Sequence, residues 1–155
     1  MLVTQNIDGL HQCAGSREVI ELHGNLARDK CSRENIVMSR DDQHMRNGLF
    51  TCARCGAYLR PDVVWFGESL PSDALERAIR AAMQCDVLLT IGTSALVEPA
   101  ASLPRIAKRA KAFVVEINPD ETPVSSLANV VVREKSGVAL PALFAEIKSK
   151  LLTGK

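Results

Sequence analysis

The most specific chemical pattern in the sequence is a pair of cysteines at knuckle spacing. Residues 52–56 read Cys-Ala-Arg-Cys-Gly, a small turn that lets two thiolates face one zinc ion. Cys31 is a third candidate ligand, with 20 residues between it and Cys52. Glu34 and His44 are alternatives for the fourth position, and Glu34 has the better offset. Carboxylates are unusual in structural zinc sites, so a module that folds without metal is the alternative interpretation.

Polar residues also follow three apolar stretches that have the composition of buried strands. Ligands bind outside the carboxyl ends of the strands in open α/β sheets. If all three polar groups lie at the same edge of one sheet, they predict a nucleotide-binding crevice there. The alternative is that they are ordinary turn and cap residues. The chain has no Gly-x-Gly-x-x-Gly and no P-loop, so a dinucleotide site would be incomplete or of another type. The three groups are Gln5, Asn6, Ile7 and Asp8; Gly92, Thr93 and Ser94, expected near a helix start; and Asn118, Pro119 and Asp120.

His23 is a candidate general base, because imidazole titrates near neutral pH and this residue ends an apolar stretch beside Gly24. A lone histidine is more often structural, which is the alternative. Cys13 and Cys85 have no neighbouring histidine or basic cluster, so we interpret them as core or surface thiols.

The elements that must position these residues alternate between strands and helices. Apolar runs predict strands at 2–4, 19–22, 63–66, 86–91, 112–117 and 129–132. Helical spacing predicts helices over 73–84, up to about residue 109, and from Leu140 to Leu151 with Pro141 in the first turn. This alternation indicates a parallel α/β sheet, and the polar segment from Asn25 to about Arg60 indicates an inserted module.

Composition narrows the class of protein further. With 155 residues and 46% apolar content the chain is expected to fold as a globular body, and its net charge of +1 gives no footprint for nucleic acid or membrane. An odd set of five cysteines favours a reducing compartment with a metal or free thiols. No secretory signal or spanning segment is visible, so we expect a cytoplasmic protein.

Several ordered motifs together resemble the sirtuins, and the chain is most similar to a bacterial-type member. They are residues 4–11 (Thr-Gln-Asn-Ile-Asp-Gly-Leu-His), 21–24 (Glu-Leu-His-Gly), the cysteine module, 60–68 (Arg-Pro-Asp-Val-Val-Trp-Phe-Gly-Glu), 92–94 (Gly-Thr-Ser) and Ile117-Asn118. The resemblance covers the whole chain but only about the C-terminal two-thirds of a sirtuin core. We therefore expect the family's opening Gly-Ala-Gly-x-Ser loop to lie before Met1, and expect residues 1–155 alone to bind NAD poorly and to lack deacylation.

The resemblance implies an NAD-dependent protein-lysine deacylase with a fold of class α/β. Its parts would be a partial Rossmann-like parallel sheet with helices on both faces, residues 1–24 and 61–155, and a zinc-binding module, residues 25–60. NAD and Zn²⁺ are the implied cofactors, and acylated-lysine proteins or peptides the implied partners.

The resemblance also implies roles for individual residues. The acyl oxygen would attack the nicotinamide ribose as nicotinamide leaves, and His23 would then act as general base through a ribose hydroxyl. The remaining matches are Asn6 and Asp8 as catalytic residues at the nicotinamide end; Gln5, Asn6, Ile7, Asp8, Gly92, Thr93, Ser94, Asn118, Pro119, Asp120 and Ser136 as cofactor-binding; Val64, Phe66, Gly67, Glu68, Leu96 and Val97 as substrate-binding; and Cys31, Cys52, Cys55 and Glu34 as metal ligands.

The chain departs from the family pattern at Glu34, where a cysteine is usual, and at Glu98, where many relatives carry an aromatic or amide residue. A non-catalytic remnant that binds a peptide or partner is the alternative to the enzyme. A zinc-ribbon nucleic-acid binder is weaker, because Arg54 and Arg60 are too few for a basic patch.

Overall fold

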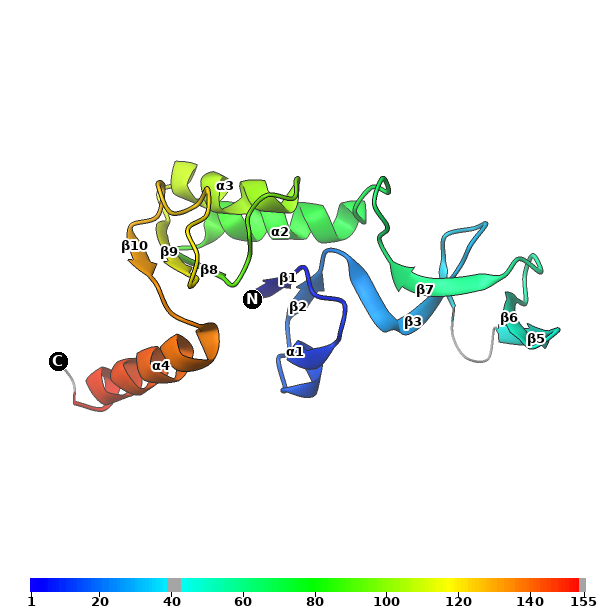
Figure 1. The fold of residues 1–155 in the computed structure, drawn as a ribbon, viewed down its shortest axis with the longest axis horizontal. Helices are drawn as coiled ribbons and strands as arrows, with labels where there is room; N and C mark the ends of the chain where they lie inside the picture. The colour runs from blue at the N-terminus through cyan, green and yellow to red at the C-terminus, as the bar shows by residue number, and fades with distance from the viewer. Residues whose placement is uncertain (39–42, 154–155) are drawn as a thin grey trace. The chain divides into compact units, whose positions relative to one another are not determined.

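The computed structural model describes residues 1–38 and 43–153. The chain divides into two compact units, Met1–Arg77 and Ala78–Lys155. Both units carry parallel strand pairs, and the first also carries antiparallel strands (Figure 1). The α/β class with a small cysteine module is therefore confirmed. The assignment of residues 1–24 and 61–155 to one domain stays a prediction.

The first unit begins with a two-stranded parallel sheet. Strand β1 (Leu2–Thr4) pairs with β2 (Val19–Glu21), and the short helix α1 (Leu10–Cys13) lies between them in the chain. Ile20 and Leu22 are almost completely buried, so the apolar run that predicted the second strand forms a core. Register places Thr4 opposite Glu21, which brings the ends of both strands together.

Antiparallel strands form the rest of the first unit. Strand β3 (Gly24–Cys31) lies between β4 (Val37–Met38) and β7 (Leu59–Val63), and β5 (Gln43–Arg46) pairs with β6 (Leu49–Cys52). Cys31, Met38 and Cys52 form a small buried cluster. The strand expected over 63–66 instead ends at Val63, because the chain turns back when the Glu68 N–H bonds the Trp65 carbonyl.

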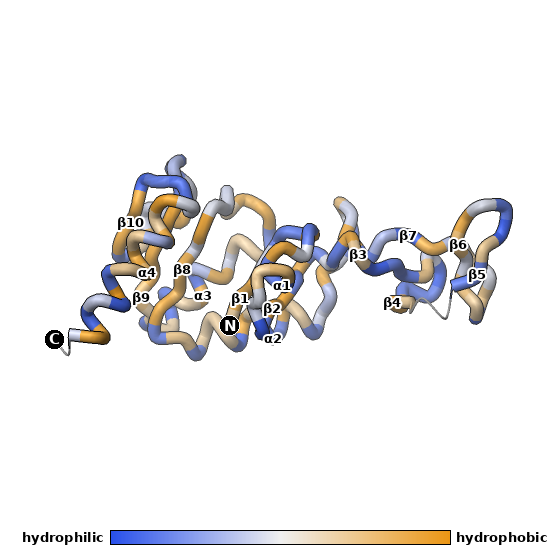
Figure 2. The backbone as a smooth tube through the Cα atoms, turned by 90° about the horizontal axis from the view of Figure 1, so that it is seen from below, coloured by the Kyte–Doolittle hydropathy of each residue, from blue (hydrophilic) through white to orange (hydrophobic). Residues whose placement is uncertain are grey.

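The second unit contains a parallel sheet in the order β10-β9-β8. Its strands are β8 (Val87–Ile91), β9 (Phe113–Ile117) and β10 (Val130–Val132), and Figure 2 shows β8 and β9 as largely hydrophobic. The 3-10 turn η2 (Ala100–Ser102) leads into α3 (Leu103–Arg109), which packs on β9. Helix α2 (Ser72–Gln84) forms where the apolar spacing predicts a helix, and the boundary between the two units falls within it.

The three polar strand ends fall in two units, and their sharing of one sheet edge stays a prediction. Thr4 ends a strand of the two-stranded sheet, whereas Ile91 and Ile117 end strands of the three-stranded sheet. Apolar runs specify that strands form, but pairing depends on which backbone edges meet. Sequence alternation alone could not supply that information.

Helix α4 (Ser136–Thr153) begins earlier than predicted, so Pro141 lies inside it rather than in its first turn. None of its residues is buried.

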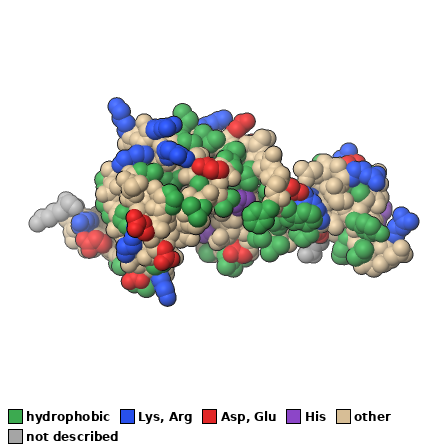
Figure 3. Space-filling model, turned by 45° about the horizontal axis from the view of Figure 1, so that its top comes forward, with side chains coloured by type: hydrophobic (Ala, Val, Ile, Leu, Met, Phe, Trp, Pro, Cys, Tyr) green, Lys and Arg blue, Asp and Glu red, His purple; other side chains and the backbone are tan. Residues whose placement is uncertain are grey.

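No helix in the described part of the chain is both long enough and apolar enough to cross a membrane. Figure 3 shows acidic and basic side chains on the same face of the molecule, in line with a net charge of +1.

Candidate functional site

His23 lies next to the end of β1 because the parallel pairing of β1 and β2 aligns the two chains. The Leu22 N–H donates to the Thr4 carbonyl at 3.0 Å, and one residue further the His23 Nδ1 lies 2.9 Å from the Gln5 carbonyl oxygen. A carbonyl can only accept, so Nδ1 carries the hydrogen, and in the neutral ring Nε2 then keeps a lone pair. The half-buried ring is therefore held in the form that can accept a proton at Nε2.

The loop after β1, which contacts His23 through the Gln5 carbonyl, carries polar side chains. Asn6 and Asp8 are exposed, and Ile7 is half-buried with its carbonyl bonded to the Leu26 N–H at 2.8 Å. Asp8 Oδ1 accepts the Leu10 N–H at 3.0 Å and thereby closes the turn into α1. The bend has a local cause, because Gly9 between them adopts a φ of 70° that favours glycine.

Gly24 allows β3 and β7 to approach closely directly after His23. Its φ is +78°, and an added Cβ would lie 1.9 Å from the Asp62 carbonyl oxygen. The close approach lets the Val64 N–H donate to the His23 carbonyl at 3.0 Å. Residue 64 is thereby fixed next to the candidate base.

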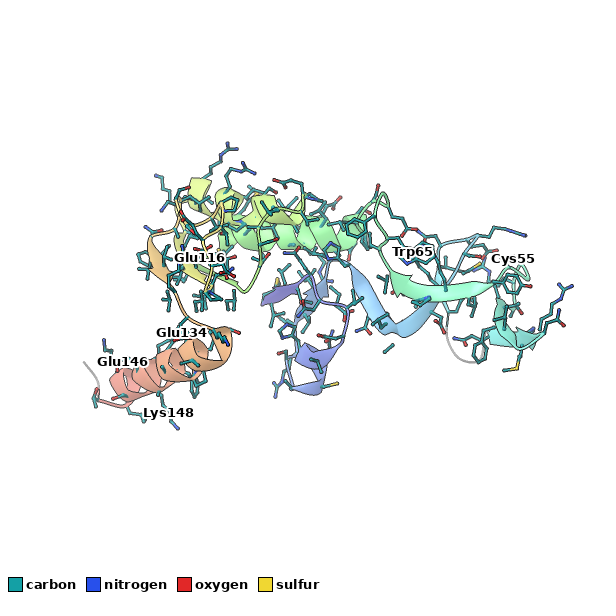
Figure 4. All side chains as sticks on the ribbon, in the orientation of Figure 1. Cys55, Trp65, Glu116, Glu134, Glu146 and Lys148 are labelled. Atoms are coloured by element: carbon teal, nitrogen blue, oxygen red, sulfur yellow. The ribbon has the colours of Figure 1, made fainter. Side chains whose placement is uncertain are left out.

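Glu68 holds the segment that follows β7 in a tight turn. Its carboxylate accepts the Trp65 N–H at 3.1 Å and Arg60 Nη2 at 2.5 Å, and Arg60 lies 4.3 Å from the Trp65 ring centroid (Figure 4 labels Trp65). The backbone bond from Trp65, followed by the bond from Arg60, lowers the pKa of Glu68 below its ordinary value. Phe66, at the tip of this turn, is fully exposed.

In the second unit, the ends of β8 and β9 are tied together. Asn118 Nδ2 donates to the Thr93 carbonyl at 2.8 Å, and the Gly92 N–H donates to the Ile117 carbonyl at 3.0 Å. Gly92 has a φ of 60°, and an added Cβ would meet nothing within 4 Å, so open space borders the backbone there. Ser94 is exposed.

No helix begins directly after Ser94, contrary to expectation, since η2 starts at Ala100. Thr93 Oγ1 instead accepts the Ala95 N–H at 3.2 Å, which keeps the chain in a turn. Leu96 and Val97 follow in this segment and are 70% and 50% exposed. Ser136 is the first residue of α4 and is half-buried.

Asp120, the last residue of the third group, follows Pro119 and is exposed. Its N–H donates to Asn118 Oδ1 at 3.1 Å. The structure thus brings Thr93 and the group 118–120 together. Asn6, Asp8 and His23 belong to the first unit.

Three cysteines form a compact group in the first unit. The Sγ atoms of Cys31, Cys52 and Cys55 all lie within 4.8 Å of one another, with 3.4 Å between Cys31 and Cys55. Zinc bound at about 2.3 Å from each sulfur places tetrahedral sulfurs about 3.8 Å apart, so the group fits this ion. The Glu34 backbone N–H donates to Cys31 Sγ, and this bond is the largest cause of the lowered pKa of that thiol.

The Glu34 carboxylate is not part of that compact group. Its buried Oε2 accepts no hydrogen bond from the described residues and lies 3.4 Å from Arg54 Nε. His44 is exposed on β5 and also lies outside the group. The Arg54 guanidinium is the cation beside this oxygen, and Glu34 as the fourth zinc ligand stays a prediction.

Sequence reasoning missed a buried carboxylate that pairs with an arginine in the second unit. Glu116, on β9, is 1% exposed, and its Oε2 lies 2.8 Å from Arg133 Nη1 (Figure 4 labels Glu116). Hydrogen bonds from Ser125, Thr122 and Arg133 outweigh burial, which acts in the opposite direction, and lower the pKa of this carboxyl. A charged residue in the run Phe-Val-Val-Glu-Ile was the available signal.

A model of the Sir2 family matches residues 1–99 of the chain. The chain is 47% identical over 152 residues to the NAD-dependent protein deacylase 2 of Pyrobaculum aerophilum, covering 98% of this chain and 61% of that protein. The structure of a Sir2 homolog-NAD complex matches with a TM-score of 0.87 and 45% identity, covering 96% of this chain and 58% of that one. The structure of Sir2 bound to acetylated peptide matches with a TM-score of 0.82 and 35% identity, covering 93% of this chain and 62% of that one. The chain thus spans about 60% of the length of these relatives.

Proposed function

Because the chain belongs to the Sir2 family, we propose that the protein is an NAD-dependent protein-lysine deacylase. The observation that carries this proposal is the hydrogen bond between His23 Nδ1 and the Gln5 carbonyl, at 2.9 Å. It holds the His23 base against Gln5, which begins the loop after β1 that carries Asn6 and Asp8. Relatives named as NAD-dependent protein deacylases support the reaction class.

The described strand ends have the chemistry that NAD requires. Asn6, Asp8 and Ser94 offer exposed amide, carboxylate and hydroxyl groups, and open space borders the Gly92 backbone. We assign NAD to these residues together with Gln5, Ile7, Thr93, Asn118, Pro119, Asp120 and Ser136. When bound, NAD supplies the ribose carbon that receives the acyl group while nicotinamide leaves.

In this mechanism His23 keeps its hydrogen at Nδ1 and accepts a proton at Nε2. General-base catalysis by a positioned histidine contributes about 100-fold to 10,000-fold to the rate. Asn6 and Asp8 orient the reacting end of the cofactor from the loop after β1. The half-buried position of His23 limits how far the ring can turn away.

The proposed substrate is an acylated lysine in an extended peptide. Val64 and Phe66 would line the channel for the lysine stem, and an apolar channel accepts a neutral acyl-lysine but disfavours a charged ammonium. Gly67 and Glu68 form one peptide-binding edge, and Leu96 and Val97 the other, by main-chain hydrogen bonding. The name of one solved relative, Sir2 bound to acetylated peptide, supports this class of substrate.

Zinc has a structural role in this proposal, with Cys31, Cys52, Cys55 and Glu34 as its ligands. A closed site of four protein ligands leaves no position for substrate, so the metal would stabilise the small module. We also place the protein in the cytoplasm, because its cysteines form no disulfide and a reducing compartment keeps a cluster of zinc-binding thiolates intact.

The experiment that tests the function compares His23→Ala with the wild type in the polypeptide that the gene encodes. Turnover of an acetyl-lysine peptide with NAD should fall about 100-fold or more, while the thermal midpoint changes little. His44→Ala is the matched control, because that histidine is exposed on β5. Peptide binding by the wild type without any turnover would support the non-catalytic alternative.

A further inference from the structure

Glu116 is a buried carboxylate inside an otherwise apolar strand. Its Oε2 accepts Ser125 Oγ at 2.6 Å and Arg133 Nη1 at 2.8 Å, and its Oε1 accepts the hydroxyl of Thr122. Burial of a charge is unfavourable unless partners surround it, and here three donors do so. The carboxylate thus anchors residues that lie six to 17 positions further along the chain.

Arg133 links this anchor to the loop after β9. Nη1 also lies 3.0 Å from the carbonyl oxygen of Asp120 and 3.3 Å from that of Asn118, and Nη2 donates to Ser125 Oγ at 2.8 Å. The guanidinium is planar and presents its N–H groups in a fixed fork. An orientation set by Glu116 therefore sets the positions of both loop carbonyls.

The side chain of Asn118 links the loop after β9 to the loop after β8. Its Oδ1 accepts the Asp120 N–H at 3.1 Å, and its Nδ2 donates to the Thr93 carbonyl at 2.8 Å. Both polar atoms of this amide thus bond to backbone. Asn118 acts here mainly as a link between the ends of β8 and β9.

We propose that Arg133, oriented by Glu116, is a positioning residue that sets the loop 118–120, and through Asn118 the Thr93 carbonyl, for binding NAD. The inference rests on the proposed function, because it takes NAD as the ligand of these loops. Arg133 acts through backbone carbonyls and is not itself placed against the nucleotide. The backbone carbonyl of Asp120, 3.0 Å from Arg133 Nη1, is the loop group whose position it controls most directly.

Lysine is a discriminating replacement at position 133. It keeps the charge that compensates Glu116, but a single ammonium cannot reach the carboxylate, Ser125 and two carbonyls with a planar fork. Arg133→Lys should therefore preserve the fold and loosen the loop. Arg77→Lys is the matched control, because Arg77 forms an exposed pair with Asp73.

The test uses the polypeptide that the gene encodes and two readouts. Titration calorimetry with ADP-ribose should give about tenfold weaker binding for Arg133→Lys, and the KM for NAD should rise while the KM for acetyl-lysine peptide stays constant. Amide hydrogen exchange without ligand should accelerate at residues 120 and 122 and stay slow in β9. Ser125→Ala should give the same pattern with a smaller change.

The outcomes separate this inference from the function on which it rests. Wild-type protein that fails to bind ADP-ribose would refute the proposed cofactor and with it the nucleotide role of Arg133. Wild-type binding that Arg133→Lys leaves unchanged would overturn the inference alone. An equal rise of both KM values with a lower thermal midpoint would also overturn it, because that pattern indicates a general structural role.

Discussion

The Nδ1 atom of His23 lies 2.9 Å from the backbone carbonyl oxygen of Gln5. Because the acceptor belongs to the main chain, no side-chain substitution at position 5 removes it. The parallel register of β1 and β2 is what places the two residues together. The fold of the first unit therefore determines that the hydrogen of the His23 ring lies on Nδ1.

This relationship predicts the tautomer of the neutral ring. At a pH where His23 is uncharged, nitrogen NMR should show the hydrogen on Nδ1, since the carbonyl accepts it, and a bare Nε2. His44, exposed on β5, serves as the reference. A spectrum with the hydrogen on Nε2 would contradict the proposed base.

Gly24→Ala should be much more destabilising than an ordinary glycine substitution. The new Cβ would meet the Asp62 carbonyl at 1.9 Å and the backbone φ is +78°, so strand β7 must move. Gly15→Ala isolates the effect of φ, because Gly15 has a φ of +88° and nothing within 4 Å. We expect a loss of about 1 kcal/mol for Gly15→Ala and about 3 kcal/mol or more for Gly24→Ala in urea unfolding. Equal losses would show that the close approach is not important.

Removal of a clustered thiol should release zinc. Elemental analysis of protein purified without chelator should find about one zinc per chain, and Cys52→Ser should lose most of it. Cys13→Ser is the control, because Cys13 is exposed and outside the group. Wild-type protein with less than about a tenth of an equivalent and an unchanged fold would refute the metal site.

The fourth ligand is tested by Glu34→Gln. If the carboxylate binds the ion, this variant should hold zinc more weakly in a chelator competition. Unchanged affinity would instead identify Glu34 as a partner of Arg54 alone, at the 3.4 Å separation between them.

Glu116 should contribute stability that disappears in acid. Its folded-state pKa lies below the ordinary glutamate value because bonds from Ser125, Thr122 and Arg133 outweigh burial. Such a group stabilises the fold above pH of about 4.3, and the contribution is lost as pH falls through the folded-state pKa. The thermal midpoint of Glu116→Gln should therefore lie below that of wild type at pH 7, and the gap should narrow below about pH 4.3.

The control for this pH dependence is Glu146→Gln, because Glu146 forms an exposed pair with Lys150 on α4. That variant should follow the wild-type midpoint at every pH. A constant gap between Glu116→Gln and wild type would contradict the assigned role of the carboxylate.

The sequence predicted the elements better than their pairing. Leu2–Thr4 and Val87–Ile91 form the expected strands, because runs of apolar residues specify local extended structure. That the first of these strands pairs with β2 and the second with β9 depends on edges that meet in space, which a run does not encode. The early start of α4 was missed because Pro141 resembles a first-turn proline.

The cysteine group was predictable because two ligands are close in sequence and form one turn. The pair Glu116 and Arg133 was not, because 17 positions separate residues that meet only after β9 and β10 align. Both polar atoms of Asn118 bond to backbone, which also could not be read from the sequence. Sequence motifs thus supplied candidate site residues, whose roles stay predictions, but not the contacts that hold them.

The central claim is that the protein transfers an acyl group from lysine to NAD-derived ADP-ribose. The most direct measurement incubates the polypeptide that the gene encodes with an acetyl-lysine peptide and NAD, and quantifies the products by mass spectrometry. The account predicts one nicotinamide and one acetyl-ADP-ribose for each lysine that is freed, and none of these without peptide. Free lysine produced equally with and without NAD, or nicotinamide release that does not depend on the acetylated peptide, would contradict it.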